Sequence, residues 1–93
     1  MKLYALVHIY DGSLVDGGVQ LNASTIRSNM EDEMYRQLEE ALKALQELHP
    51  EGIDEYGSDY CESLGFAYIS HLELDANDST REVFDHEWRI VEL

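Results

Sequence analysis

The fold is decided by residues 28–50, whose sequence is SNMEDEMYRQLEEALKALQELHP. Apolar side chains recur in this stretch at intervals of three and four residues, the spacing of one face of an α-helix. They are Met34, Leu38, Ala41, Leu42, Leu45 and Leu48. Ser28 followed by Glu31 matches a capping box, and His49-Pro50 predicts the helix end. The stretch therefore predicts one amphipathic helix that covers one face of a second layer.

The sequence before the helix predicts a β-hairpin. Residues 2–10, KLYALVHIY, alternate with apolar side chains on both faces, which is typical of a central strand. Glycine and aspartate in residues 11–18 are turn signals, and residues 19–21 are expected to form a short second strand.

The sequence after the helix predicts a loop over residues 51–64 and strands over residues 65–74 and 83–93. In the last strand four side chains are expected on one face: Phe84, His86, Trp88 and Ile90.

The predicted fold class is α+β in the order β-β-α-β-β, an antiparallel sheet with one amphipathic helix packed on one face. The 93 residues are expected to form a single domain, 1–93. We expect Leu6, Tyr10 and some strand aromatics on the open face of the sheet, which favours a homodimer.

The charge is strongly negative. Twenty acidic residues face six basic ones, a formal net charge of −14. Such a charge repels nucleic acid and anionic lipid, so direct binding to either is not expected. No apolar run is long enough to cross a membrane, the start MKLY is not a signal peptide, and one cysteine cannot form an internal disulfide. These features predict a cytoplasmic protein without membrane contact.

The acidity is uneven along the chain. Residues 1–50 hold eight acids and four bases, whereas residues 51–93 hold twelve acids and two bases. Like charges on a small domain oppose folding, so the surplus of acidic residues in the second half indicates a role other than stability.

Metal binding is a weak alternative. His8, His71 and His86 lie on three predicted strands, but no pair has the spacing of a zinc motif. Residues 75–80 begin like a calcium loop, yet Thr80 and His86 stand where glycine and glutamate are needed. We therefore expect no metal and no other cofactor, although a strand-borne histidine gives pH sensitivity without metal.

Catalysis is not expected either. Cys61 lies between Asp59 and Glu62, whose charges disfavour the reactive thiolate. The chain has no glycine-rich phosphate loop, G-x-S-x-G or H-E-x-x-H motif. The sequence predicts a protein that is not an enzyme.

The remaining signal is a mixture of carboxylates and tyrosines after Pro50. Tyrosine is enriched at protein interfaces, and carboxylates two residues apart on a strand, as in Asp85 and Glu87, form a row about 6.6 Å apart. The candidate partner-binding residues are Glu51, Asp54, Glu55, Tyr56, Asp59, Tyr60, Glu62, Asp75, Asp78, Asp85 and Glu87. Such a surface would be steered to a basic partner.

In size and acidity the whole chain resembles the phage-encoded anti-restriction and anti-CRISPR inhibitors, which present carboxylates in place of DNA phosphates. That resemblance implies a nucleic-acid mimic that blocks or regulates a basic protein of the nucleic-acid-handling kind. Two alternatives stay open: a small structural or halophile-type protein whose acidity serves solubility, and a weak metal- or small-ligand-binding module.

Overall fold

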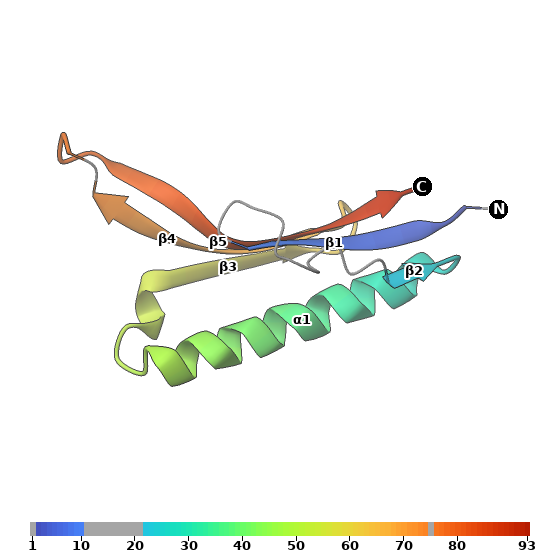
Figure 1. The fold of residues 1–93 in the computed structure, drawn as a ribbon, viewed down its shortest axis with the longest axis horizontal. Coiled ribbons are helices and arrows are strands. Elements are labelled where there is room, and N and C mark those ends of the chain that lie inside the picture. The colour runs from blue at the N-terminus through green and yellow to red at the C-terminus, as the bar shows by residue number, and fades with distance from the viewer. Residues whose placement is uncertain (1, 11–21, 75) are drawn as a thin grey trace.

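The computed structural model describes residues 2–10, 22–74 and 76–93. It contains one five-stranded antiparallel sheet in the order β2-β1-β5-β4-β3 and one long helix, α1, that lies along the sheet (Figure 1). The elements are β1 (Tyr4–Tyr10), β2 (Asn22–Ser24), α1 (Arg27–Leu48), the 3-10 turn η1 (Ile53–Glu55), β3 (Tyr56–Cys61), β4 (Phe66–Leu74) and β5 (Thr80–Glu92). The predicted α+β class with an antiparallel sheet and one helix is confirmed.

The predicted order β-β-α-β-β is wrong, because part of the expected loop 51–64 is the edge strand β3. Gly57, Ser58 and Asp59 have low strand propensity, so this segment carries no strand signal of its own. Its backbone pairs with β4 along its full length, from Tyr56 opposite His71 to Cys61 opposite Phe66. The neighbouring strand therefore decides the structure of this segment.

The helix begins two residues earlier than the capping box predicts, and the expected capping box is wrong. Residue Ile26 occupies the N-cap position and makes no side-chain cap hydrogen bond, which leaves Ser28 inside the first turn. The Ser24 hydroxyl instead accepts hydrogen bonds from the Ile26 N–H, at 3.1 Å, and from the Asn29 side chain, at 3.2 Å. The short strand β2 thus ends with two residues between it and the start of α1, and Ser24 connects the two elements by these hydrogen bonds.

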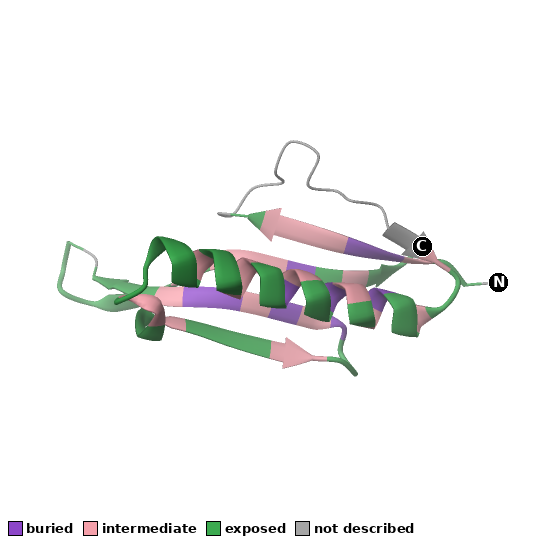
Figure 2. Cartoon of the chain, turned by 90° about the horizontal axis from the view of Figure 1, so that it is seen from below, coloured by how far each residue is buried: buried purple, intermediate pink, exposed green. Residues whose placement is uncertain are grey.

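The core lies between α1 and the face of the sheet that α1 covers (Figure 2). Its buried members are Leu6, Met30, Met34, Leu38, Ala67, Ile69 and Trp88. The apolar stripe starts a turn before the predicted one, at Met30, and it stops short of Leu48, which is 73 % exposed. The fully buried residues of α1 therefore all lie within its first twelve residues.

Strand β1 lies between β2 and β5, as expected for a strand that is apolar on both faces. The predicted strand 19–21 and its turn lie outside the described residues. The expectation that Leu6 and Tyr10 lie on the open face is wrong: Leu6 is buried in the core, and Tyr10 packs against His86 on the same side of the sheet. Alternation alone does not say which of two apolar faces meets the helix.

A β-bulge in β5 divides its pattern. Ile69 pairs with His86, but the next residue, Ser70, pairs with Phe84, so Asp85 is the extra residue. The shift turns Phe84 to the opposite face from His86, Trp88 and Ile90, and the prediction that all four share a face is wrong for Phe84. The open face gains an aromatic side chain as a result.

Gly65 closes the turn between β3 and β4, with a φ angle of +70°. Its N–H donates to Cys61 O and its carbonyl accepts from the Ile90 N–H at 2.8 Å. A β-carbon there would lie 3.0 Å from Arg27 Nη2 and 3.1 Å from Ile90 Cβ. Since the left-handed conformation costs other residues about 1–2 kcal/mol, Gly65→Ala should destabilise the protein by at least that amount.

Urea unfolding measures this loss, and Gly57→Ala is the matched control. A β-carbon on Gly57 meets only Ser70 Oγ, at 4.0 Å, so that variant should change the free energy of unfolding by less than about 0.5 kcal/mol. Equal effects of the two substitutions would contradict this account of the turn.

Candidate functional site

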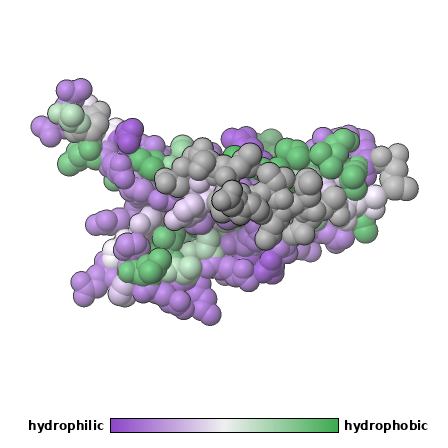
Figure 3. All heavy atoms as spheres, in the orientation of Figure 1, coloured by the Kyte–Doolittle hydropathy of each residue, from purple (hydrophilic) through white to green (hydrophobic). Residues whose placement is uncertain are grey.

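The predicted partner-binding residues fall into separate groups, and the largest group lies at one end of the molecule. Glu51, Asp54 and Glu55 occupy the tight turns between α1 and β3, next to Glu47 in the last helical turn. Asp78 and Glu82 lie at the same end, on the β4–β5 hairpin (Figure 1). We call these six carboxylates the acidic end. Figure 3 shows an indentation between the two parts that carry them.

The carboxylates of the acidic end have no cation within 4 Å among the described residues. The basic side chains with ion partners lie elsewhere or use other acids. The pairs are Lys2–Glu92, Arg27–Glu31, Arg36 with Glu33 and Glu40, and Arg81–Glu73. The last turn of α1 also holds no basic residue, so the negative end of the helix dipole adds to the field there.

Arg36 shows how the helix neutralises its own charge. Its Nε lies 2.9 Å from Glu33 Oε2 and its Nη1 lies 2.6 Å from Glu40 Oε1. The hydrogen bonding of Arg36 to Glu33, with a further hydrogen bond from Gln37, lowers the pKa of Glu33 to about 2. The middle of α1 therefore presents paired charge, in contrast to its C-terminal end.

Tyr56 lies inside the acidic end, half-buried between two histidine rings. The centroid of its ring is 5.8 Å from that of His49 and 5.5 Å from that of His71. Burial, followed by the charges of Asp85 and Glu55, raises the pKa of its hydroxyl. This tyrosine is the aromatic side chain that the acidic end offers.

The other predicted residues are not part of this end. Asp59, on the edge strand β3, accepts a hydrogen bond from the Tyr60 N–H, and Glu62 lies in the turn beyond β3. The Tyr60 hydroxyl donates to Glu31 O at 3.2 Å and its ring packs edge-on against Tyr35. Tyr60 therefore joins β3 to α1. Asp75 lies outside the described residues.

The expected row of Asp85 and Glu87 does not form, because the bulge separates them. Asp85 Oδ2 lies 2.6 Å from His71 Nδ1, on the helix side, whereas Glu87 pairs with Tyr68 on the open face. Glu73 Oε1 lies 2.8 Å from His71 Nε2. With a carboxylate at each ring nitrogen, His71 is held as an imidazolium; hydrogen bonds to Asp85 and Glu73 raise its pKa.

His8 and His86 form a second histidine arrangement. His8 Nε2 lies 2.9 Å from His86 Nδ1, and both rings stack on Trp88, with centroids 4.6 and 5.3 Å away. One ring donates and the other accepts, which requires at least one neutral ring. Burial, followed by the charge of His8, lowers the pKa of His86 to about 4, and burial lowers that of His8.

Two of the three histidines considered for metal binding therefore meet, while His71 is held by carboxylates. Within residues 2–10, 22–74 and 76–93 no group of three or more His, Cys, Asp or Glu side chains is arranged to hold a metal ion. Cys61 is a free thiol, 3.5 Å from the Ser63 hydroxyl.

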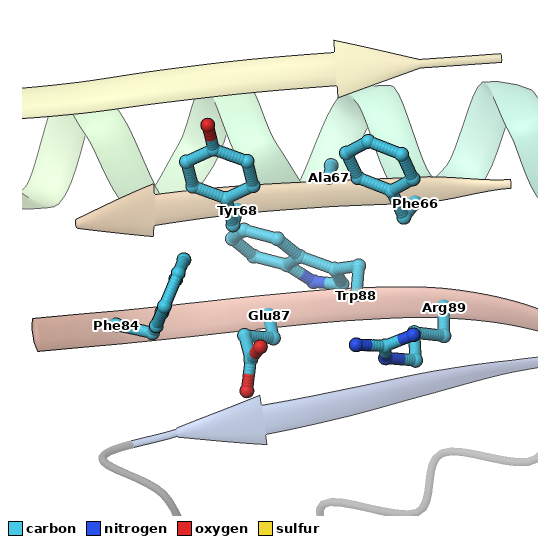
Figure 4. A pocket seen from close by; sticks show the side chains of 7 residues that line it. All are labelled: Phe66, Ala67, Tyr68, Phe84, Glu87, Trp88 and Arg89. Atoms are coloured by element: carbon cyan, nitrogen blue, oxygen red, sulfur yellow. The ribbon is translucent and has the colours of Figure 1, made fainter. Parts of the chain in front are cut away.

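The open face of the sheet carries a hollow of about 300 Å³ that the sequence analysis missed. Figure 4 shows Phe66 and Tyr68 side by side over β4, with Phe84, Glu87 and Arg89 on β5. The alternation of residues 66–74 could have indicated the β4 part, but the bulge that adds Phe84 leaves no sequence signal.

Comparison with known proteins adds no assignment: no protein-family model matches the chain, and no curated protein or solved structure is detectably similar to it. None of the helical residues in the described part of the chain form a span long and apolar enough to cross a membrane.

Proposed function

We propose that the chain is a non-enzymatic binding protein that takes hold of a basic partner protein, of the kind that handles nucleic acid, and blocks or regulates it. The observation that supports this is the acidic end, where carboxylates from the helix end and from the β4–β5 hairpin gather and have no cation within 4 Å among the residues that the structure describes. Unpaired like charges oppose folding, so their retention at one end favours a role in binding.

A cationic partner segment would meet carboxylates on both sides of the indentation. Glu51, Asp54 and Glu55 lie on one side, and the β4–β5 hairpin, which carries Asp78, lies on the other. Such a field accelerates encounter with a positive surface and disfavours acidic partners. We further propose a cytoplasmic setting, because the chain has a single cysteine, Cys61.

The decisive experiment compares two charge reversals of equal size. Asp54→Lys with Glu55→Lys changes the acidic end, and Asp32→Lys with Glu39→Lys changes the exposed face of α1 by the same charge. Tagged wild type and both variants are used to capture proteins from a host lysate, with elution by a salt gradient. We expect the first variant to lose the captured basic proteins at least about tenfold and the second to keep them.

Competition by duplex DNA then tests the class of partner. DNA should displace the wild-type protein from a captured partner whose binding site is its nucleic-acid surface. Retention of the same proteins by wild type and by the Asp54→Lys, Glu55→Lys variant would contradict the proposal, and so would a complex that DNA does not disturb.

A further inference from the structure

The open face of the sheet is the surface that α1 does not cover. Phe66, Tyr68 and Phe84 form its aromatic centre: the first two rings lie nearly parallel, at 6.3 Å, and the last meets Tyr68 edge-on, at 5.3 Å. Glu87 and Arg89 line the same hollow (Figure 4). Aromatic residues with few charges are typical of the centre of a protein interface.

Exposed apolar side chains extend this centre along the sheet. Register places Leu72 and Leu74 on the same face of β4 as Tyr68, and they are 66 % and 70 % exposed. Leu3 and Val91 lie on this face at the other end, also exposed. Two acids, Asp59 on the edge strand and Glu82 near the hairpin end, lie at its border. The face is an apolar band on a strongly acidic protein.

We propose that a second copy of the chain packs against this face, open face to open face, about a two-fold axis. The charges in the hollow point to this occupant. Glu87 and Arg89 are two residues apart on one face of β5, about 6.6 Å, and neither has an ion partner among the described side chains. A two-fold axis that crosses β5 midway between them sets Glu87 of each copy opposite Arg89 of the other.

The size of the face also suits a dimer. The five strands hold 38 residues, and each residue covers about 3.3 Å along its strand and about 4.8 Å across the sheet. The face therefore measures about 600 Å² in projection, at the lower end of the roughly 600–1,000 Å² that each partner contributes to a standard interface. A basic partner fits the hollow less well, because an acid and a base line it together.

The dependence on salt concentration distinguishes this dimer from binding of the proposed basic partner. Two copies of net charge −14 repel each other, and that repulsion is screened as the Debye length falls from about 10 Å at 0.1 M salt to about 3 Å at 1 M. We expect self-association to tighten at high salt, whereas binding of a basic partner at the acidic end weakens. The two proposals can fail independently.

The test is sedimentation equilibrium of the full chain over a wide range of concentration. Wild type should dimerise, and Arg89→Glu and Glu87→Arg should each weaken the dimer at least about tenfold. Glu87→Arg is the sharper variant, because it makes the protein less negative and would strengthen association if net charge alone mattered. The double variant that exchanges the two residues should restore the dimer.

Leu72→Ser should also weaken the dimer, with Leu48→Ser as the control, since Leu48 is similarly exposed but lies at the end of α1. Circular dichroism identifies any variant that fails to fold. If a single variant does not fold, dimerisation of the double variant that exchanges Glu87 and Arg89 decides whether the proposal holds. A monomer at every concentration, a dimer insensitive to Leu72→Ser, or no recovery by the exchange would overturn the proposal. Binding of poly-lysine to monomers through Glu87 would assign the face to a basic partner instead.

Discussion

Replacement of Trp88 by alanine is expected to lower the free energy of unfolding by about 3–5 kcal/mol. The side chain is completely buried between β1, β4 and α1, and it is the largest member of the core. Its indole N–H donates to Gln37 Oε1 at 3.0 Å, and its ring stacks on His8. The substitution therefore leaves a cavity and removes the donor for a half-buried amide. A domain of this length has only about 5–14 kcal/mol of stability in all.

Urea unfolding followed by circular dichroism measures the effect. Leu48→Ala is the control, because it also truncates a large apolar side chain but at a position that is 73 % exposed, and should cost less than about 0.5 kcal/mol. Trp88→Phe keeps a ring in the core and should fall between the two. A loss for Trp88→Ala no greater than for Leu48→Ala would show that the core is centred elsewhere.

The position of Trp88 on an alternating strand, and the apolar stripe of α1, were predictable because both follow from side-chain periodicity. The periodicity did not show that Phe84 turns away from Trp88. A bulge inserts one residue into the strand and shifts every later side chain to the other face, and pairing with β4 creates it. The pattern of a single strand does not contain the register of its neighbour.

Strand β3 illustrates the same dependence on a neighbour. Its residues Gly57, Ser58 and Asp59 favour a turn when considered alone, yet the free edge of β4 supplies their hydrogen-bond partners. Pairing with β4, and not the strand propensity of its own residues, therefore makes this segment a strand.

The candidate site was predictable only in part. Composition located the surplus of acids after Pro50, but it did not show which acids find partners. The bulge places Asp85 against His71, whereas Asp54 and Glu55 have no cationic partner in the described part of the chain. The contact between His8 and His86 joins residues 78 positions apart, and sequence spacing gives no sign of it.

The pair of His8 and His86 predicts that stability falls as the pH is lowered. In the folded protein burial and His8 lower the pKa of His86 to about 4, whereas an unfolded histidine titrates near 6.5. Between these values the unfolded chain binds a proton that the folded protein does not, so unfolding is favoured as pH falls. The lowered pKa of His86 therefore decreases the free energy of unfolding by up to about 3 kcal/mol as the pH falls from about 6.5 to about 4.

His86→Phe isolates this effect, since a phenyl ring can stay stacked on Trp88 but does not titrate. The measured quantity is the free energy of unfolding of the variant minus that of wild type, from pH 7.5 to pH 4.5. Titration of the carboxylates is common to both proteins and cancels in this difference. We expect this difference in the free energy of unfolding to increase in favour of the variant by up to about 3 kcal/mol as the pH falls.

His71→Gln should show the opposite sign, because hydrogen bonds to Asp85 and Glu73 raise the pKa of His71. The stability that His71 contributes is fully present below the unfolded pKa of about 6.5 and is lost as the pH rises through its folded pKa. The free energy of unfolding of the His71→Gln variant, relative to that of wild type, should therefore decrease as the pH is lowered. If both variants changed in the same direction, the opposite protonation states of the two histidines, one neutral against Trp88 and one cationic between two carboxylates, would be wrong.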